Sequence, residues 1–262
     1  MNYQKILTNG DKFLKTNNIK SSKIDSELLL SKVLKKNREE ILTSLNNKID
    51  EKKFNEFSHY LFRRKKKEPI AYILGFKYFW KYYFYVNKSV LIPRPDTEHI
   101  VEETLKYIPV NKSINILDIG TGSGCIIISI LNERRKCKAT AIDISNKAIK
   151  IAKTNAKLHH LENKIKFINM DIDKHNSNKY DLILSNPPYI KNIELSRLDD
   201  DIKCFEPKLA LRGGLDGYKE IKKVIRKSSE LLKERGKLII EIGKGQKEQT
   251  LIFLNDLNER RF

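Results

Sequence analysis

The sequence predicts an α/β fold: a doubly wound, mostly parallel, Rossmann-like sheet that follows a small all-α domain and a linking β-hairpin. Residues 1–75 carry apolar clusters at helical spacing, and no strand pattern interrupts them. Residues 76–92 are rich in aromatic and β-branched side chains without helical spacing, which is typical of a hairpin. From residue 93 to residue 262, short apolar strands alternate with helices, as in a parallel sheet covered on both faces.

Within residues 93–262 we expect strands and helices to follow one another in regular order. The expected strands lie at 114–120, 138–145, 164–171, 179–186 and 236–243, and the expected helices at 125–131, 146–160, 217–234 and 246–257. Such sheets bind ligands at the carboxyl ends of their strands. The functional residues are therefore expected where these strands end.

The chain of 262 residues has a formal net charge of +19, which would attract an anionic partner such as RNA or a ribonucleoprotein. Only twelve of the 52 basic residues are arginine, and the excess of lysine accompanies abundant isoleucine and asparagine, as AT-rich coding would produce. The charge therefore has a compositional explanation, and direct binding of nucleic acid is not expected.

The three cysteines, Cys125, Cys137 and Cys204, have no C-x-x-C spacing, so neither a disulfide framework nor a metal site is expected. The N-terminal residues MNYQKILTNGDKF lack the apolar core of a signal peptide, and the longest apolar stretches are too short to span a membrane. These observations favour a cytoplasmic protein in a reducing compartment, without a membrane partner.

A glycine-rich turn, DIGTGSG, follows the strand expected at 114–120. Glycine permits the tight strand-to-helix turn and a close approach of the backbone to a ligand. A dinucleotide fingerprint of the form G-x-G-x-x-G would need glycine where Cys125 stands. The turn therefore fits a nucleoside without a pyrophosphate as well or better, and its candidate ligand-binding residues are Gly120, Thr121, Gly122, Ser123 and Gly124.

Two aspartates end the next two strands. Asp143 lies about twenty residues beyond the turn, where a carboxylate accepts hydrogen bonds from ribose hydroxyls. Its alternative role is to cap the helix that follows, beside Ser145. Asp171 could accept a hydrogen bond from an adenine amino group while Ile172 packs on the ring, or it could be a plain charged loop residue.

The strand at 179–186 ends in Asn186-Pro187-Pro188-Tyr189, a combination that removes hydrogen-bond donors. Each proline lacks a backbone N–H, and Pro187 keeps Asn186 out of the helical region. The Asn186 side-chain oxygen and the Pro187 carbonyl remain as acceptors. Two fixed acceptors suit a planar NH₂ group, which offers two donors, and Tyr189 could lie against its flat face. A strand-ending turn is the alternative reading of an N-P dipeptide.

This stretch resembles the [DNS]-P-P-[YFW] signature of class I S-adenosylmethionine-dependent methyltransferases that act on planar NH₂ nitrogens of adenine, guanine or glutamine. The segments EPIAYILG (68–75), LIPRPDTE (91–98), SNPPYI (185–190) and FEPKLALRGGLDG (205–217) are similar to those of the HemK/PrmC family, the release factor glutamine methyltransferases. The similarity extends over nearly the whole chain.

The resemblance implies a cytoplasmic, monomeric enzyme of translation termination that needs no metal. It would methylate the glutamine of the Gly-Gly-Gln loop of class 1 peptide chain release factors, with S-adenosyl-L-homocysteine as the second product. Residues 120–124, Asp143 and the Asp171-Ile172 corner would hold the cofactor together with Asn186. Residues 186–189 would hold the substrate glutamine, with Asn186, Pro187 and Tyr189 in the catalytic role. Residues 1–75 would recognise the substrate, 76–92 would link the domains, and 93–262 would form the methyltransferase domain.

The sequence departs from the family after its fifth strand, because the further strand pair with which the family usually completes its sheet has no counterpart before Phe262. Three other functions stay open on the sequence: methylation of a glutamine in a ribosomal protein, amino methylation of rRNA or DNA, and a degenerate protein that binds S-adenosylmethionine without turnover.

Overall fold

The structure is a computed structural model that describes residues 1–176 and 179–259. The chain divides into two compact units, one of Met1–Gly75 with Asp200–Phe205 and one of Phe76–Asp199 with Glu206–Phe262. Each unit has its own hydrophobic core. The predicted fold class, a helical N-terminal region followed by a parallel α/β sheet, is confirmed.

The named secondary-structure elements of the first unit are all helices. Its helices are α1 (Tyr3–Thr16), α2 (Ser22–Leu34), α3 (Arg38–Leu42), α4 (Glu51–Lys65), α5 (Ile70–Leu74) and α9 (Asp200–Phe205). Side chains of Asn2, Asn37 and Asp50 cap α1, α3 and α4 by accepting bonds from backbone N–H groups of the first turn. Leu14, Leu29 and Phe57 pack in the core.

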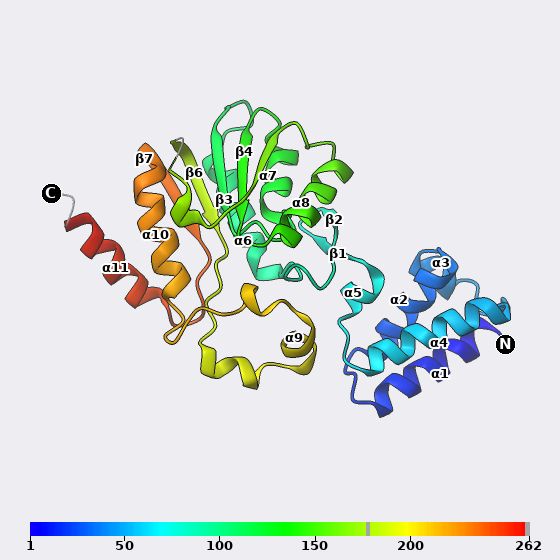
Figure 1. Ribbon diagram of the computed structural model, residues 1–262. Helices are drawn as coiled ribbons and strands as arrows, with labels where there is room; N and C mark the ends of the chain where they lie inside the picture. The colour runs from blue at the N-terminus through cyan, green and yellow to red at the C-terminus, as the bar shows by residue number, and fades with distance from the viewer. Residues whose placement is uncertain (177–178, 260–262) are drawn as a thin grey trace. The chain divides into compact units, whose positions relative to one another are not determined.

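The second unit contains a five-stranded parallel sheet in the order β5-β4-β3-β6-β7. Its elements, in chain order, are α6 (Glu98–Tyr107), β3 (Asn115–Ile119), α7 (Cys125–Glu133), β4 (Lys138–Asp143), α8 (Asn146–Leu158), β5 (Ile165–Asn169), β6 (Tyr180–Ser185), α10 (Lys219–Leu231), β7 (Leu232–Ile240) and α11 (Lys247–Glu259). Figure 1 shows the strands side by side, with their connecting helices around them.

Alternating residues of the strands enter two cores, one on each face of the sheet. Ile116 and Leu182 pack with α6 and α7, whereas their neighbours Leu117 and Ile183 pack with Val224 of α10. Helix α11 in turn packs against α10 (Figure 1). Because both faces are covered, the strands are buried apolar runs, and the polar residues that follow them emerge together at one edge.

The hairpin expected within 76–92 consists of β1 (Phe76–Phe79) and β2 (Tyr82–Tyr85). Trp80 has a φ of 58°, as a two-residue hairpin turn requires. Phe79 and Phe84 are buried in the core that contains α6 and α7. The Asn155 side chain of α8 bonds the Tyr85 backbone through both of its polar ends, at 2.7 and 3.0 Å, which ties the hairpin to the sheet unit.

The helix expected over 217–234 ends earlier, at Leu231, and the strand expected from 236 begins at Leu232. Leu232 pairs with Tyr180 of β6, and a register irregularity follows before Lys237 pairs with Leu182. Arg235, with a φ of 61°, and Gly236 lie in this interval. Pairing with β6 thus overrides the helical preference of Leu232 and its neighbours.

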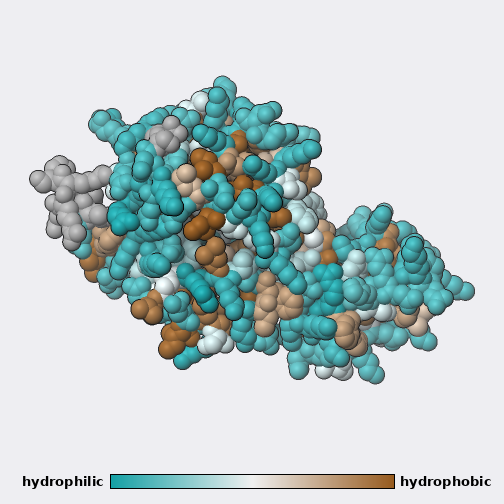
Figure 2. All heavy atoms as spheres, in the orientation of Figure 1, coloured by the Kyte–Doolittle hydropathy of each residue, from teal (hydrophilic) through white to brown (hydrophobic). Residues whose placement is uncertain are grey.

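No helix within residues 1–176 and 179–259 is both long and apolar enough to cross a membrane. Figure 2 shows a mostly hydrophilic face on which hydrophobic side chains form separate small clusters.

Candidate active site

A cavity of about 410 Å³ lies where β3, β4, β5 and β6 end. Its walls include every predicted ligand-binding residue except Gly124 and Tyr189. The predicted residues that line it are Gly120, Thr121, Gly122, Ser123, Asp143, Asp171, Ile172, Asn186, Pro187 and Pro188. Strand ends that are distant in sequence therefore contribute to one site, as expected for a doubly wound sheet.

The glycine-rich turn leaves its backbone open toward the cavity. Gly120 and Gly122 have φ values of 73° and 55°, which side chains rarely adopt, and a Cβ added to Gly120 would meet nothing within 4 Å. Gly124 is required for a different reason, namely helix packing. A Cβ there would lie 2.9 Å from Ile128 Cδ1 and 3.3 Å from Ala152 Cβ, so this glycine permits close packing of α7 and α8. The backbone at Gly120 and Gly122 therefore borders open space in the cavity.

Asp143 supports this turn and also lines the cavity. Its Oδ2 accepts a hydrogen bond from the Gly122 N–H at 2.9 Å, and its Oδ1 accepts one from the Ser145 N–H at 2.8 Å. Burial raises the pKa of this carboxyl above its usual value, and the two backbone donors offset part of that effect. Ser145 itself caps α8 through its hydroxyl, so Asp143 is not the residue that caps this helix.

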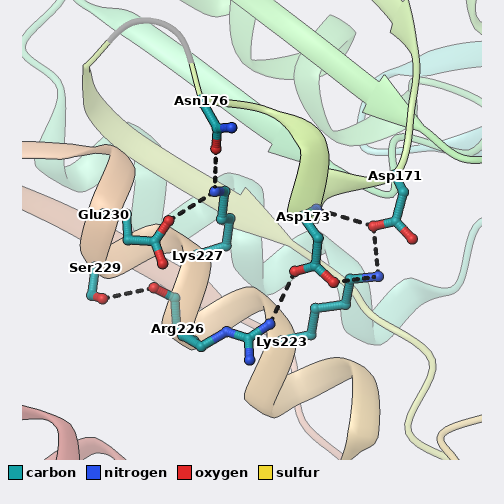
Figure 3. Close-up of polar contacts among 8 residues, drawn as sticks. All are labelled: Asp171, Asp173, Asn176, Lys223, Arg226, Lys227, Ser229 and Glu230. Carbon is teal, nitrogen blue, oxygen red and sulfur yellow. Dashed lines mark hydrogen bonds and ion pairs between the residues drawn. The ribbon is translucent and has the colours of Figure 1, made fainter.

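Asp171 forms an ion pair with Lys223 of α10, which the sequence did not suggest (Figure 3). Its Oδ1 lies 2.6 Å from Lys223 Nζ and accepts a bond from the Asp173 N–H at 3.0 Å, whereas Oδ2 accepts no hydrogen bond from the described residues. Burial raises the pKa of Asp171, but the hydrogen bonds from Lys223 and the Asp173 backbone outweigh it, so the pKa lies below its usual value. The ionised Oδ2 can thus accept from a ligand.

Asn186 has a fixed side-chain orientation. Its Nδ2 donates to the hydroxyl oxygen of Thr97 at 3.0 Å, and both residues line the cavity. The Asn186 Oδ1 and the Pro187 carbonyl receive no hydrogen bond from any residue in the described part of the chain. The preceding Ser185 donates its hydroxyl to the Ile119 carbonyl at 2.8 Å, which fixes the end of β6 against β3. Two free acceptors therefore stand together at the end of β6.

Tyr189 does not line the cavity but anchors the same segment from outside it. Its hydroxyl donates to Glu241 Oε1 at 3.2 Å, and its carbonyl accepts a bond from Gln246 Nε2 at 3.3 Å. Burial, followed by the neighbouring Glu241, raises the pKa of Tyr189 to about 12. The phenol therefore remains protonated at neutral pH, and residues after β7 hold the segment in place.

Several residues of the site were missed from the sequence. Thr97 and Arg94 lie in the quoted LIPRPDTE segment, and Glu206 lies in FEPKLALRGGLDG, but no chemistry had been assigned to them. Glu206 accepts from Arg94 Nη2 at 2.5 Å and from the Ile92 N–H at 3.3 Å, joining two cavity walls. Asp118, at the start of the glycine-rich turn, was also missed.

The Asp118 side chain is fully buried, and burial raises its pKa to about 7. Its Oδ2 accepts from the Thr121 hydroxyl at 2.6 Å, whereas its Oδ1 has no partner among the residues described. Within residues 1–176 and 179–259, no group of three or more His, Cys, Asp or Glu side chains could hold a metal ion.

The fold, the cavity and the matching family models together identify a class of enzyme, the S-adenosylmethionine-dependent methyltransferases. A family model described as "Methyltransferase small domain" matches residues 101–198, and a model described as "PrmC N-terminal domain" matches residues 5–75. Together they cover parts of both units.

Two relatives identify the family. A release factor glutamine methyltransferase of Clostridium acetobutylicum is 39% identical over 229 residues, which are 86% of this chain and 80% of that protein. One of Fusobacterium nucleatum subsp. nucleatum is 40% identical over 261 residues, which are 97% of this chain and 72% of that protein. The chain belongs to the release factor glutamine methyltransferase family, as its motifs predicted.

Among solved structures, the ribosomal protein L11 methylase of Lactobacillus delbrueckii subsp. bulgaricus is 20% identical with a TM-score of 0.47. The match covers 64% of this chain and 70% of that one.

Proposed function

We propose that this protein transfers a methyl group from S-adenosyl-L-methionine to the side-chain N5 of the glutamine in the Gly-Gly-Gln motif of class 1 peptide chain release factors. The observation that carries the proposal is the pair of free acceptors, Asn186 Oδ1 and the Pro187 carbonyl, in the wall of a cavity that begins at a glycine-rich turn. Membership of the release factor glutamine methyltransferase family supports the choice of substrate.

The cavity walls fit the cofactor. The open backbone at Gly120 and Gly122 suits close approach of a ligand, and Asp143 offers the remaining lone pairs of its carboxylate to ribose hydroxyls. At the other end, Asp171 Oδ2 suits the adenine amino group, and the buried Ile172 suits packing on the ring. When bound, the cofactor supplies an electrophilic methyl group on a sulfonium. S-adenosyl-L-homocysteine is the second product, and no metal is required.

An amide nitrogen is a weak nucleophile because its lone pair is delocalised into the carbonyl, the same resonance that gives a peptide bond its rotation barrier of ~18–20 kcal/mol. In the proposed mechanism, Asn186 Oδ1 and the Pro187 carbonyl each accept one N–H of the substrate amide. They thereby orient the nitrogen toward the methyl group and stabilise the positive charge that develops on nitrogen.

A carbon–nitrogen bond forms as the carbon–sulfur bond breaks, and the nitrogen then loses a proton to water. A strong general base is not required, because the proton leaves only after nitrogen has become cationic. We propose that Tyr189 forms one wall of the position that the substrate glutamine occupies. Its contacts with Glu241 and Gln246 hold it there.

The surroundings of the cavity suit a protein substrate. Leu209, which lines the cavity, is 56% exposed, and Leu215 in the same loop is 87% exposed. Apolar side chains at such positions can contact a docked polypeptide. We further propose that residues 1–75 recognise the release factor, that the enzyme acts as a monomer, and that it works in the cytoplasm.

The test supplies labelled S-adenosylmethionine with purified release factor, ribosomal protein, rRNA and DNA, and locates the label by mass spectrometry. Label on the Gly-Gly-Gln glutamine is the expected result. Label on another glutamine or on a base would show that the substrate is a different one from that proposed. No label on any of them would favour a protein that binds the cofactor without turnover.

The matched variant is Asn186→Ala. We expect it to slow methyl transfer roughly 10²- to 10³-fold, by analogy with removal of one preorganised partner in other enzymes. Thermal unfolding must show that the variant is folded. Near-normal turnover by a folded Asn186→Ala protein would refute the assignment of this residue.

A further inference from the structure

A side-chain amide has two unlike ends, and only one of them is useful opposite a substrate NH₂ group. The oxygen accepts hydrogen bonds, whereas the nitrogen only donates them. If the Asn186 amide turned over, its NH₂ would face the NH₂ of the substrate, and no hydrogen bond could form between them. Something must therefore hold the amide with its oxygen toward the substrate.

Thr97 is in the position to do this. Its hydroxyl oxygen accepts a hydrogen bond from Asn186 Nδ2 at 3.0 Å. The Thr97 residue is only 3% exposed, so little water competes for this contact. In this orientation Nδ2 donates to Thr97, and Oδ1 is the end of the amide that remains available in the cavity.

The turn that carries Thr97 is itself held in place. It is the short 3₁₀ turn Pro95–Thr97, directly before α6, and the Thr97 N–H donates to the Arg94 carbonyl at 3.2 Å. The Arg94 guanidinium binds Glu206, and the next residue, Glu98, accepts a bond from the Trp80 N–H at 2.8 Å. Contacts on both sides of Thr97 thus fix the turn that carries its hydroxyl.

We propose that Thr97 is a positioning residue for methyl transfer: its hydroxyl oxygen holds the Asn186 amide so that Oδ1 faces the substrate amide. The inference rests on the proposed role of Asn186 and goes further, since it assigns a function to the PRPDTE segment. Thr97 does not touch the reacting atoms in this assignment, so its effect on the reaction is transmitted wholly through Asn186.

The test compares side chains that differ in the hydroxyl at residue 97. Thr97→Val removes the hydroxyl and keeps the branched shape, whereas Thr97→Ser keeps the hydroxyl. We expect Thr97→Val to lower kcat about 10- to 50-fold, because one neutral hydrogen bond is lost and the amide can turn. The KM for release factor and the Kd for cofactor should stay close to wild type, and Thr97→Ser should recover most of kcat. If Thr97→Val fails to fold, Thr97→Ala against Thr97→Ser gives the same comparison.

Thr104 provides a matched control. It lies two turns further along in α6, is fully buried, and its hydroxyl has no partner among the described residues. Thr104→Val makes the same chemical change without a link to Asn186, and it should leave kcat unchanged.

A double-mutant cycle completes the test. In the Asn186→Ala background, Thr97→Val should cause no additional loss of kcat, since two residues that act as one unit are not additive. The inference is overturned if Thr97→Val retains wild-type kcat, if Thr97→Ser is as slow as Thr97→Val, or if the two losses multiply. These results differ from failure of the proposed function, in which wild-type enzyme would not label the glutamine or Asn186→Ala would not slow the labelling.

Discussion

Replacement of Asp143 by asparagine tests the cofactor end of the cavity with a change of very few atoms. In the wild type, both carboxylate oxygens already accept a backbone N–H, from Gly122 and from Ser145. An asparagine keeps one acceptor oxygen and places an NH₂ group against the other N–H. The substitution therefore removes an acceptor from the cavity and sets two donors against each other beside the glycine-rich turn.

The expected loss of binding affinity follows from the hydrogen bond that the substitution removes. A hydrogen bond to a charged group contributes about 1.5–3 kcal/mol, and its loss corresponds to a roughly 10- to 150-fold weaker complex. We expect a loss in this range for binding of S-adenosyl-L-homocysteine to Asp143→Asn.

Isothermal titration calorimetry with S-adenosyl-L-homocysteine measures the effect directly. Asp181→Asn is the matched control, because the Asp181 carboxylate also accepts a backbone N–H, from Asn115 at 2.8 Å, but near the start of β6 and away from the cavity. It should alter stability and leave the dissociation constant unchanged. If Asp143→Asn binds as tightly as wild type, or if both variants weaken binding equally, the assignment of Asp143 to the ribose is refuted.

Three further predictions concern the same cavity. Because burial raises the pKa of Asp118 from 3.8 to about 7, the free energy of unfolding should fall as pH rises through this interval, by roughly 4 kcal/mol at most. Urea unfolding of Asp118→Asn should show a weaker dependence on pH, and an unchanged dependence would contradict the assignment. Lys223→Met should raise the pKa of Asp171, so as pH is lowered from neutral, cofactor affinity should begin to fall at a higher pH than in wild type. Lys227→Met, one turn further along α10, is the control for that titration, and a fall that begins at the same pH in both variants would count against the ion pair. Gly122→Ala forces a side chain into a backbone with a φ of 55°, so cofactor binding should weaken at least about tenfold, and calorimetry that finds wild-type affinity would show that this turn tolerates alanine.

The fold was predictable because its signals are local. The apolar runs before Gly120 and Asn186 are long enough to be recognised as buried strands, and both residues come where the strands end. The boundary at Leu232 was not predictable, because pairing with Tyr180 of β6 decides it. Sequence near residue 232 contains no information about a partner about fifty residues earlier, so a helical preference there is misleading.

The residues of the site likewise fall into those that the sequence could predict and those that it could not. Asp143 and Asn186 could be predicted because each follows a strand and carries a polar group suited to a ligand. Thr97 and Lys223 could not, because their importance comes from contacts with Asn186 and Asp171 that only the folded chain creates. The pattern of the PRPDTE segment was visible in the sequence, but its physical role depends on residues almost ninety positions away.

Three acceptors of the cavity share one physical arrangement. Asp143 is held by backbone N–H groups, Asp171 by Lys223, and Asn186 by Thr97, and in each case a donor from the protein fixes the group while a lone pair remains for the ligand. A donor that is already in place reduces the entropy lost on binding, since the acceptor does not have to be ordered by the ligand. It also reduces the reorganisation needed as charge develops during methyl transfer. Loss of such a donor should therefore act through the acceptor that it holds. Loss of Lys223 should lower cofactor affinity through Asp171, and loss of the Thr97 hydroxyl should lower kcat through Asn186.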